Sequence, residues 1–250
     1  MHRRQALKLF AGLALCPLCA PQGFAADAHW SYEGAEGPAK WGELDAASQA
    51  CSVGIQQSPI DIGDTIKAQL DPLKITWDKS ADTIVNNGHT IQLNIGDSSV
   101  LGYGNTNYRF LQFHFHRPSE HLIGGKSLPM EAHFVHANTK GSLAVIGVLM
   151  TTGRANAVFN KIVSTMPEKA GPAAKADPAI NPNGLLPAAR NYYRYSGSLT
   201  TPPCSETVDW LLLTDPIQVA EADVARFAQL YPMNARPVQK GNRRFVLRSA

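Results

Sequence analysis

The sequence predicts a single, mainly β domain with a large central twisted sheet, mostly antiparallel, and a few short surface helices. Short strand-like segments alternate with turns from Ile75 onward, and Asn87-Gly88 between two of them is a typical hairpin turn. Residues 143–150 are apolar throughout, which indicates a strand buried on both faces. A chain of 250 residues can form one large domain or two small ones, and the lack of repeats or of a linker favours one.

The N-terminal segment is expected to be a secretory signal peptide. It combines a basic start, an apolar run at residues 9–20 and alanine-rich sequence up to Ala28. The apolar run is too short to span a membrane. The Arg3-Arg4 pair resembles a twin-arginine export signal, so the mature protein is expected in the periplasm or outside the cell, after cleavage between Ala25 and Ala28.

The charge of the mature chain gives no case for a nucleic-acid or anionic-membrane partner. The formal net charge is +3, and residues 1–28 hold three basic residues and one acidic residue. Removing them leaves a nearly neutral protein. No segment after the signal is apolar over a length that would span a membrane, so no membrane span is expected.

Cysteine usage agrees with export. Cys16 and Cys19 lie in the expected signal peptide, which leaves Cys51 and Cys204 as a pair in the mature chain. Two free buried cysteines are the alternative, but exported proteins rarely keep them.

Five of the eight histidines fall within residues 112–136. Phenylalanine and valine make this stretch strand-like, and residues i and i+2 of a strand share a face, so His114 and His116 point the same way. A glycine-containing connection at 123–126 can return the chain as an antiparallel neighbour and bring His133 opposite the pair. Three histidines without a nearby cysteine or aspartate are typical of a catalytic zinc site, which keeps its fourth position open.

The same strand period supplies partners for these histidines. Gln112 lies two residues before His114, and Glu131 lies two residues before His133, so each can accept an N–H from an imidazole on its own face. The alternative is a histidine-rich core strand with unrelated surface histidines. These matched partners make that alternative the weaker interpretation.

The remaining segments carry less chemistry. Residues 30–62 read as an irregular N-terminal arm, and residues 156–166 have helical spacing that ends before a proline. Residues 167–188 are rich in proline, alanine and glycine, so we expect a long surface loop. Residues 195–204 form a proline-containing loop that presents two threonine hydroxyls.

Together these motifs resemble the zinc-ligand region and later segments of the α-class carbonic anhydrases, in particular an exported bacterial member. The resemblance runs from about Trp30 to the C-terminus and rests on three strings: Q-F-H-F-H-R-P-S-E-H at 112–121, M-E-A-H-F-V-H at 130–136 and Y-S-G-S-L-T-T-P-P-C at 195–204. It implies that residues 29–250 form one catalytic domain with that family's fold. It also implies a disulfide between the two mature cysteines, Cys51 and Cys204.

The resemblance further implies a role for each matching residue. The Zn²⁺ ligands would be His114, His116 and His133, oriented by Gln112, Glu131 and the carbonyl of Asn234. The residues acting on protons would be His89 as a shuttle, and Thr200 donating its hydroxyl hydrogen to Glu120. The substrate pocket would be lined by Gln92, Val135, Val145, Leu199, Thr201, Val208 and Trp210.

Two of these implied roles raise a question of strand geometry. His89 follows the predicted hairpin turn, and by itself it reads as a polar residue beside an exposed turn. Gln92 has the opposite strand parity to His89. Both can line one cavity only if a bulge intervenes or if His89 still belongs to the turn.

The implied function is the reversible hydration of carbon dioxide to bicarbonate and a proton, by a zinc-bound hydroxide with a histidine proton shuttle. Carbon dioxide and bicarbonate are then the partners, and a homodimer is an open alternative to a monomer. Two other functions stay open: a zinc hydrolase acting mainly as an esterase, and a non-catalytic binding protein of the same fold.

Overall fold

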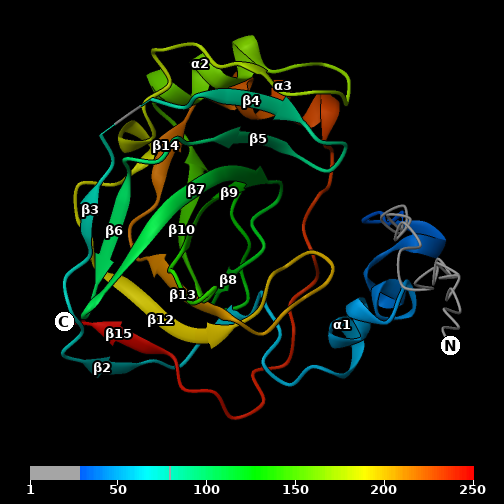
Figure 1. Cartoon of the computed structure of the whole chain (residues 1–250), viewed down its shortest axis with the longest axis vertical. Coiled ribbons are helices and arrows are strands. Elements are labelled where there is room, and N and C mark those ends of the chain that lie inside the picture. The colour runs from blue at the N-terminus through cyan, green and yellow to red at the C-terminus, as the bar shows by residue number, and fades with distance from the viewer. Residues whose placement is uncertain (1–28, 79) are drawn as a thin grey trace, which may run out of the picture.

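The computed structural model describes residues 29–78 and 80–250 (Figure 1). The predicted signal peptide, including the twin-arginine pair, lies outside the described residues. Within the described part of the chain, a 13-stranded sheet and a separate two-stranded sheet form the body of the molecule. No helix among the described residues is both long and apolar enough to span a bilayer. The prediction of a mainly β fold around one large sheet is confirmed.

The large sheet is twisted and mixed, with most pairs antiparallel. Its main path runs β11-β4-β5-β7-β9-β10-β13-β12-β15-β2, while β6 joins β3 to β7 and β14 pairs with β10. The parallel pairs are β10 with β13, β10 with β14, and β15 with β2. The strands of this sheet are β2 (Ile66–Ala68), β3 (Lys74–Thr76), β4 (Thr83–Asn86), β5 (Ile91–Asn94), β6 (Val100–Tyr103), β7 (Thr106–His116), β9 (Met130–Ala137), β10 (Leu143–Thr152), β11 (Ala174–Lys175), β12 (Tyr192–Gly197), β13 (Val208–Leu213), β14 (Ile217–Val219) and β15 (Leu247–Ser249).

The centre of the sheet consists of its three longest strands, β7, β9 and β10, which lie in the middle of Figure 1. The apolar run predicted as a doubly buried strand is β10, which is buried from Ala144 to Met150. The packing explains why residue 147 is glycine, because an added Cβ would lie 2.7 Å from Leu212 Cδ1 and 3.2 Å from Glu131 Oε1. A side chain at this position would collide with the neighbouring strands, and so glycine allows the close approach.

The predicted hairpin is also present. β4 and β5 pair antiparallel with Asn86 opposite Ile91, so the connection comprises residues 87–90. Gly88 has φ +88°, a left-handed conformation that glycine adopts without strain.

Two helices cover one end of the sheet. α2 (Ala157–Thr165) and α3 (Glu221–Leu230) lie beyond β4 and β5 in Figure 1. The side chain of Asn156 accepts two backbone N–H groups at the start of α2, which makes it the helix cap. The predicted helix over 156–166 is therefore confirmed, with its ends one residue inside the predicted range.

The prediction for residues 167–188 was only partly right. The segment is not a purely exposed loop, because β11 pairs with β4 and a short 3₁₀ helix, η4 (Pro182–Leu185), follows. Ile180 and Leu185 are fully buried in the main core. The high proline and glycine content led to the prediction of a surface loop, although Ile180 and Leu185 pack into the core.

The N-terminal arm packs against the body through a small aromatic cluster. The arm contains η1 (Gly34–Glu36), η2 (Pro38–Glu43), η3 (Ala47–Gln49) and α1 (Ala50–Val53), and then β1 (Asp61–Ile62) pairs with β8 (Leu122–Ile123). Trp41 is fully buried beside the disulfide between Cys51 and Cys204. The guanidinium of Arg236 lies over the Trp41 ring and donates to the carbonyl of Cys51. The arm, the disulfide loop and the C-terminal segment are thus held together at one place.

The disulfide is expected to contribute strongly to stability, because it joins residues 153 positions apart. Replacing both cysteines by serine should lower the free energy of unfolding by about 2–5 kcal/mol, since the unfolded chain would lose its cross-link. Urea denaturation monitored by tryptophan fluorescence measures this difference. Reductant should destabilise the wild type similarly and leave the double variant unchanged. An unchanged transition midpoint in the double variant would contradict the expectation.

Candidate metal and catalytic site

Three imidazoles meet at the centre of the sheet because of the pairing between β7 and β9. His114 lies directly opposite His133 in the antiparallel register, and His116 lies two residues further along β7. The ring centroids are 4.5–5.4 Å apart. One nitrogen from each ring lies within 4.8 Å of the other two. The three histidines therefore come together as predicted, because His114 and His116 share one face of β7 and His133 lies opposite them on β9.

A fixed hydrogen-bond acceptor lies beside the second nitrogen of each ring. His114 Nδ1 lies 2.8 Å from Gln112 Oε1, and His133 Nε2 lies 2.9 Å from Glu131 Oε1. His116 Nδ1 lies 2.8 Å from the carbonyl oxygen of a residue outside the sheet, Asn234. An N–H directed at each acceptor leaves the other nitrogen of that ring with a free lone pair.

The lone pairs left in this way fit a metal ion. His116 Nε2 is buried and has no hydrogen-bond partner among the described residues. An unsatisfied buried polar atom costs about 1–3 kcal/mol, so it calls for an explanation such as a bound ion. Burial is the main cause that lowers the pKa of His114 and His133, and it lowers that of His116 to about 4. All three rings are therefore neutral near pH 7, as metal ligands must be.

Glu131 connects the histidine cluster to a second buried histidine that the sequence analysis did not identify. Its Oε1 lies 2.7 Å from His121 Nδ1 as well as 2.9 Å from His133 Nε2, and its Oε2 accepts the backbone N–H of His121. Burial alone would raise the pKa of Glu131, but its interactions with the His121 and His133 rings hold that pKa well below its usual range. The carboxylate is thus ionised and fixed between two rings.

The hydrogen-bond chain continues outward from His121. Its Nε2 lies 2.6 Å from the Tyr195 hydroxyl, which also contacts Ser58 Oγ at 3.0 Å. All members of this chain are buried. No strand period places His121, because it lies between β7 and β8, and only the folded chain shows that it supports Glu131.

Glu120 lies beside the cluster as a buried acid. Its Oε1 accepts the backbone N–H of Arg236 at 2.8 Å, and its Oε2 lies 3.9 Å from His133 Nδ1 without a hydrogen-bond partner among the described residues. Burial raises the pKa of Glu120 to about 7, although the charge of His133 and the Arg236 amide act in the opposite direction.

The hydroxyl of Thr200 is close to this carboxyl group. Thr200 is buried and also lowers the pKa of Glu120, yet no hydrogen bond of ordinary length and angle joins the two side chains.

An apolar wall stands next to His133. Val135 and Val145 are cross-strand neighbours, and Val145 is in turn the register partner of Trp210. The Trp210 ring lies 4.8 Å from the His133 ring. The apolar residues expected to line a substrate pocket belong to one cluster: Val135, Val145, Leu199, Val208 and Trp210.

Two further expected pocket residues are polar. Gln92 lies opposite His114 in the pairing of β5 with β7, so it borders the cluster on the side away from the apolar wall. Thr201 is half-buried and follows Thr200 in the loop that ends at the disulfide.

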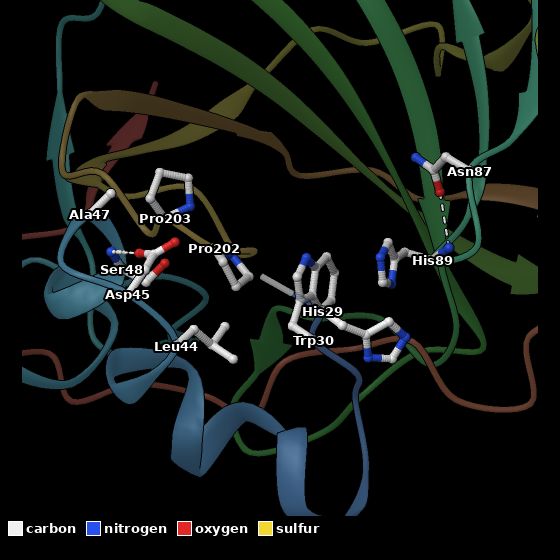
Figure 2. Close-up of a pocket in the computed structure, with 10 residues that line it drawn as sticks. All are labelled: His29, Trp30, Leu44, Asp45, Ala47, Ser48, Asn87, His89, Pro202 and Pro203. Atoms are coloured by element: carbon white, nitrogen blue, oxygen red, sulfur yellow. Dashed lines mark hydrogen bonds between the residues drawn. The ribbon is translucent and has the colours of Figure 1, made fainter. Parts of the chain in front are cut away.

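His89 belongs to the hairpin turn and not to β5, which removes the parity conflict with Gln92. Its ring stacks on Trp30 with a centroid separation of 3.7 Å and an interplanar angle of 6°. Figure 2 shows the two rings beside a cavity of about 600 Å³ whose lining also includes Pro202 and Pro203. None of the three clustered histidines lines this cavity, so it lies outside the histidine cluster.

Asn234 links the turn to the histidine cluster. Its carbonyl oxygen holds His116, while its side-chain amide donates to the carbonyl oxygens of His89 at 3.0 Å and Phe115 at 2.9 Å. One residue from the C-terminal segment therefore fixes both a clustered histidine and the turn that carries His89.

A family model, curated proteins and a solved structure that resemble this chain all carry the same family name. A family model described as eukaryotic-type carbonic anhydrase matches residues 36–250. Proteins named carbonic anhydrase from Pectobacterium carotovorum and Klebsiella pneumoniae are 40% and 43% identical over 220 and 222 residues, covering 88% of this chain and 90% of each relative. The solved α-carbonic anhydrase of Thermovibrio ammonificans, in complex with the inhibitor sulfanilamide, has a TM-score of 0.86 at 42% identity, covering 88% of this chain and 99% of that chain.

The stacked environment of His89 leads to a testable pKa. Partial burial disfavours the charged ring and is the main cause that lowers the pKa of His89 below 6.5, with the nearby His29 as a second cause. An NMR titration of the ring protons should therefore give a midpoint below 6.5. Trp30→Ala exposes the ring and should raise the midpoint towards 6.5. A midpoint above 6.5 in the wild type would show instead that cation–π attraction to Trp30 outweighs burial.

Proposed function

We propose that this chain, which belongs to the eukaryotic-type carbonic anhydrase family, hydrates carbon dioxide reversibly to bicarbonate and a proton by using Zn²⁺ held by three histidines. Membership in the family supports the activity and the small-molecule substrate. The observation that carries the metal assignment is the buried His116 Nε2, which has no partner among the described residues and lies within a cluster of neutral imidazoles.

The ligand set would be His114 and His116 through Nε2 and His133 through Nδ1. These are the nitrogens left free when the opposite nitrogens bond to Gln112, Asn234 and Glu131. Three neutral nitrogen ligands suit zinc and leave one position open for chemistry. Zinc bound there supplies a Lewis acid that makes water a nucleophile near neutral pH.

Thr200 and Glu120 would orient the attacking oxygen. Glu120 Oε2 would accept the Thr200 hydroxyl hydrogen, and the Thr200 oxygen could then only accept a hydrogen from the nucleophile. This directs a lone pair of the nucleophile towards the substrate, which is an orientation effect. Support comes from the burial of both groups and from the otherwise unpartnered Oε2. The pairing requires an ionised Glu120, and a cation beside His133 would favour that form.

Carbon dioxide would bind against the apolar wall beside His133. The molecule has no net charge or dipole, so a slot of valine and tryptophan side chains suits it better than hydrogen-bond donors do. The register of β9, β10 and β13 supports this position, because it presents Val135, Val145 and Trp210 beside His133. Thr201 and Gln92 would contact the more polar bicarbonate at the edges.

His89 would carry the proton out. Its lowered pKa keeps it neutral near pH 7, so its free ring nitrogen can accept a proton and release it to buffer. Its place beside an open cavity at the surface supports this role. The proton would travel between the cluster and His89 through water.

We also infer that the protein acts in an exported form. The disulfide between Cys51 and Cys204 points to an oxidising compartment. The basic and apolar segment at residues 1–28 has the composition of a signal peptide. Periplasmic or secreted location after its removal accounts for both observations.

The site favours carbon dioxide hydration over ester hydrolysis and over a non-catalytic binding role. Glu120 is buried, bonded to the Arg236 amide, and oriented towards the histidine cluster, so it is not placed to protonate an ester leaving group. A non-catalytic binding protein would not need a complete histidine cluster together with its three orienting acceptors.

His116→Ala tests the metal assignment. We expect loss of stoichiometric zinc binding, measured by competition with a chromophoric chelator, and loss of carbon dioxide hydration in stopped-flow assays, because two imidazoles cannot complete the site. His29→Ala is the matched control, since it removes an exposed histidine. It should bind zinc one to one, as the wild type does. A His116→Ala variant that keeps zinc and full activity would disprove the assignment.

His89→Ala tests the proton route. Turnover should fall about 10-fold or more in weak buffer, because a positioned proton carrier contributes at least this much, and added imidazole should restore it. The hydration step measured by isotope exchange at equilibrium should be unaffected, since it does not require proton release. Equal turnover of wild type and variant at low buffer concentration would mean that protons leave by another route.

A further inference from the structure

The C-terminal loop at residues 237–246, called here the basic loop, projects from the body at the foot of Figure 1. Phe245 in this loop has 73% of its surface exposed and is absent from the hydrophobic clusters of the described residues. Val238 is also exposed. A single exposed apolar side chain is ordinary, whereas several of them close together indicate an interaction site.

The other exposed apolar residues gather beside the same loop. Among the described residues, the large hydrophobics that are exposed are Val53, Ile55, Ile66, Val238 and Phe245. Asn242 Nδ2 donates to the carbonyl of Ile55 at 3.0 Å, and the amide of Ile66 donates to the carbonyl of Val246 at 2.9 Å. The three segments that carry these residues are therefore joined by hydrogen bonds and lie side by side. The exposed surface around the basic loop is called here the basic face.

This face is basic. Residues 237–250 contain four basic residues and no acidic residue, whereas residues 29–236 contain 16 basic and 19 acidic ones. Arg248 is the register neighbour of Lys67 in the pairing of β15 with β2, and both are exposed. Two like charges side by side are unfavourable, and the Arg248 guanidinium also lies over the Tyr193 ring, 6.0 Å from its centroid. The net charge of residues 29–250 is close to zero because the positive charge of residues 237–250 offsets the negative charge of residues 29–236.

The basic loop is held in shape. The guanidinium of Arg244 donates to four carbonyl oxygens, two within the loop and two on the body, at Ser196 and Gln57. Asn242 and Arg243 both have positive φ, at 47° and 62°, although neither is glycine. Such conformations cost energy and persist only where the surroundings impose them. The loop therefore presents its side chains in a fixed arrangement before any partner arrives.

We propose that this face docks the protein onto the surface of an anionic phospholipid bilayer. Phe245, Val238 and Ile55 would enter the interfacial layer, while Lys240, Arg243 and Arg248 would lie among the anionic headgroups. Exposed aromatic and aliphatic side chains ringed by lysine and arginine are the combination that binds such surfaces.

A second copy of the chain fits this face less well. A two-fold dimer would bring the same basic residues against each other, and their repulsion would oppose association. Two acidic residues are near these segments: Asp64 precedes Ile66 by two residues, and Glu206 accepts the backbone N–H of Gln56. They are fewer than the four basic residues at 237–250. The turn that carries His89 lies towards the opposite end of the molecule in Figure 1, so docking would leave the cavity beside it open to solvent.

Vesicle co-sedimentation tests the proposal on protein beginning at His29, because the apolar run at 9–20 would itself bind lipid. The wild type should sediment with vesicles that contain phosphatidylglycerol and remain in solution with phosphatidylcholine alone. The double variant Lys240→Glu and Arg243→Glu should bind at least about 25-fold more weakly, since each basic residue near the surface contributes about 5-fold. Phe245→Ser should weaken binding at both low and high salt.

The matched control reverses two exposed lysines elsewhere, Lys140→Glu and Lys175→Glu, and changes the net charge equally. It should bind almost as the wild type does. All variants should keep wild-type circular dichroism and carbon dioxide hydration in solution, which shows that they fold. The proposal fails if the wild type ignores anionic vesicles, or if the control loses as much binding as the loop variant. It also fails if the loop variants alter only self-association in sedimentation velocity.

Discussion

The site depends on the antiparallel register between β7 and β9. This register places His114 opposite His133, and the two-residue period of β7 adds His116 to the same face. A slip of one residue would turn His133 towards the opposite face, where His136 now contacts Trp77 in the main core. Burial on both sides prevents that slip, because each face of the central strands packs against a different set of residues.

Hydrogen bonds then fix the orientation of each histidine ring in the cluster and leave one nitrogen of each ring free. Each ring donates to one fixed oxygen, and only Glu131 among these acceptors carries a charge. Arg236 connects the region around the histidines to the N-terminal arm. Its backbone N–H donates to Glu120, and its guanidinium donates to the carbonyls of Ser58 and Cys51. The disulfide and the arm are therefore tied to the Glu120 carboxyl by one buried cation, Arg236, whose pKa burial lowers to about 10.

Features set by local period could be predicted from the sequence. The face shared by His114 and His116, the hairpin at Asn87-Gly88 and the doubly buried β10 all follow from strand spacing and turn chemistry. Contacts between distant segments could not be predicted in this way. His121 supports Glu131 from a loop with no period, and Arg236 reaches the arm across the whole chain. The exposed basic face is another such case, since it combines three separate segments that only folding brings together.

If the three-histidine cluster holds zinc, carbon dioxide hydration should require that metal. Stopped-flow hydration on the purified mature protein, before and after removal of metal by a chelator, tests it most directly. Turnover should be fast, should disappear on chelation and should return when one equivalent of zinc is added. Zinc bound one per chain without any hydration would contradict it, and would point to a binding protein built on this fold.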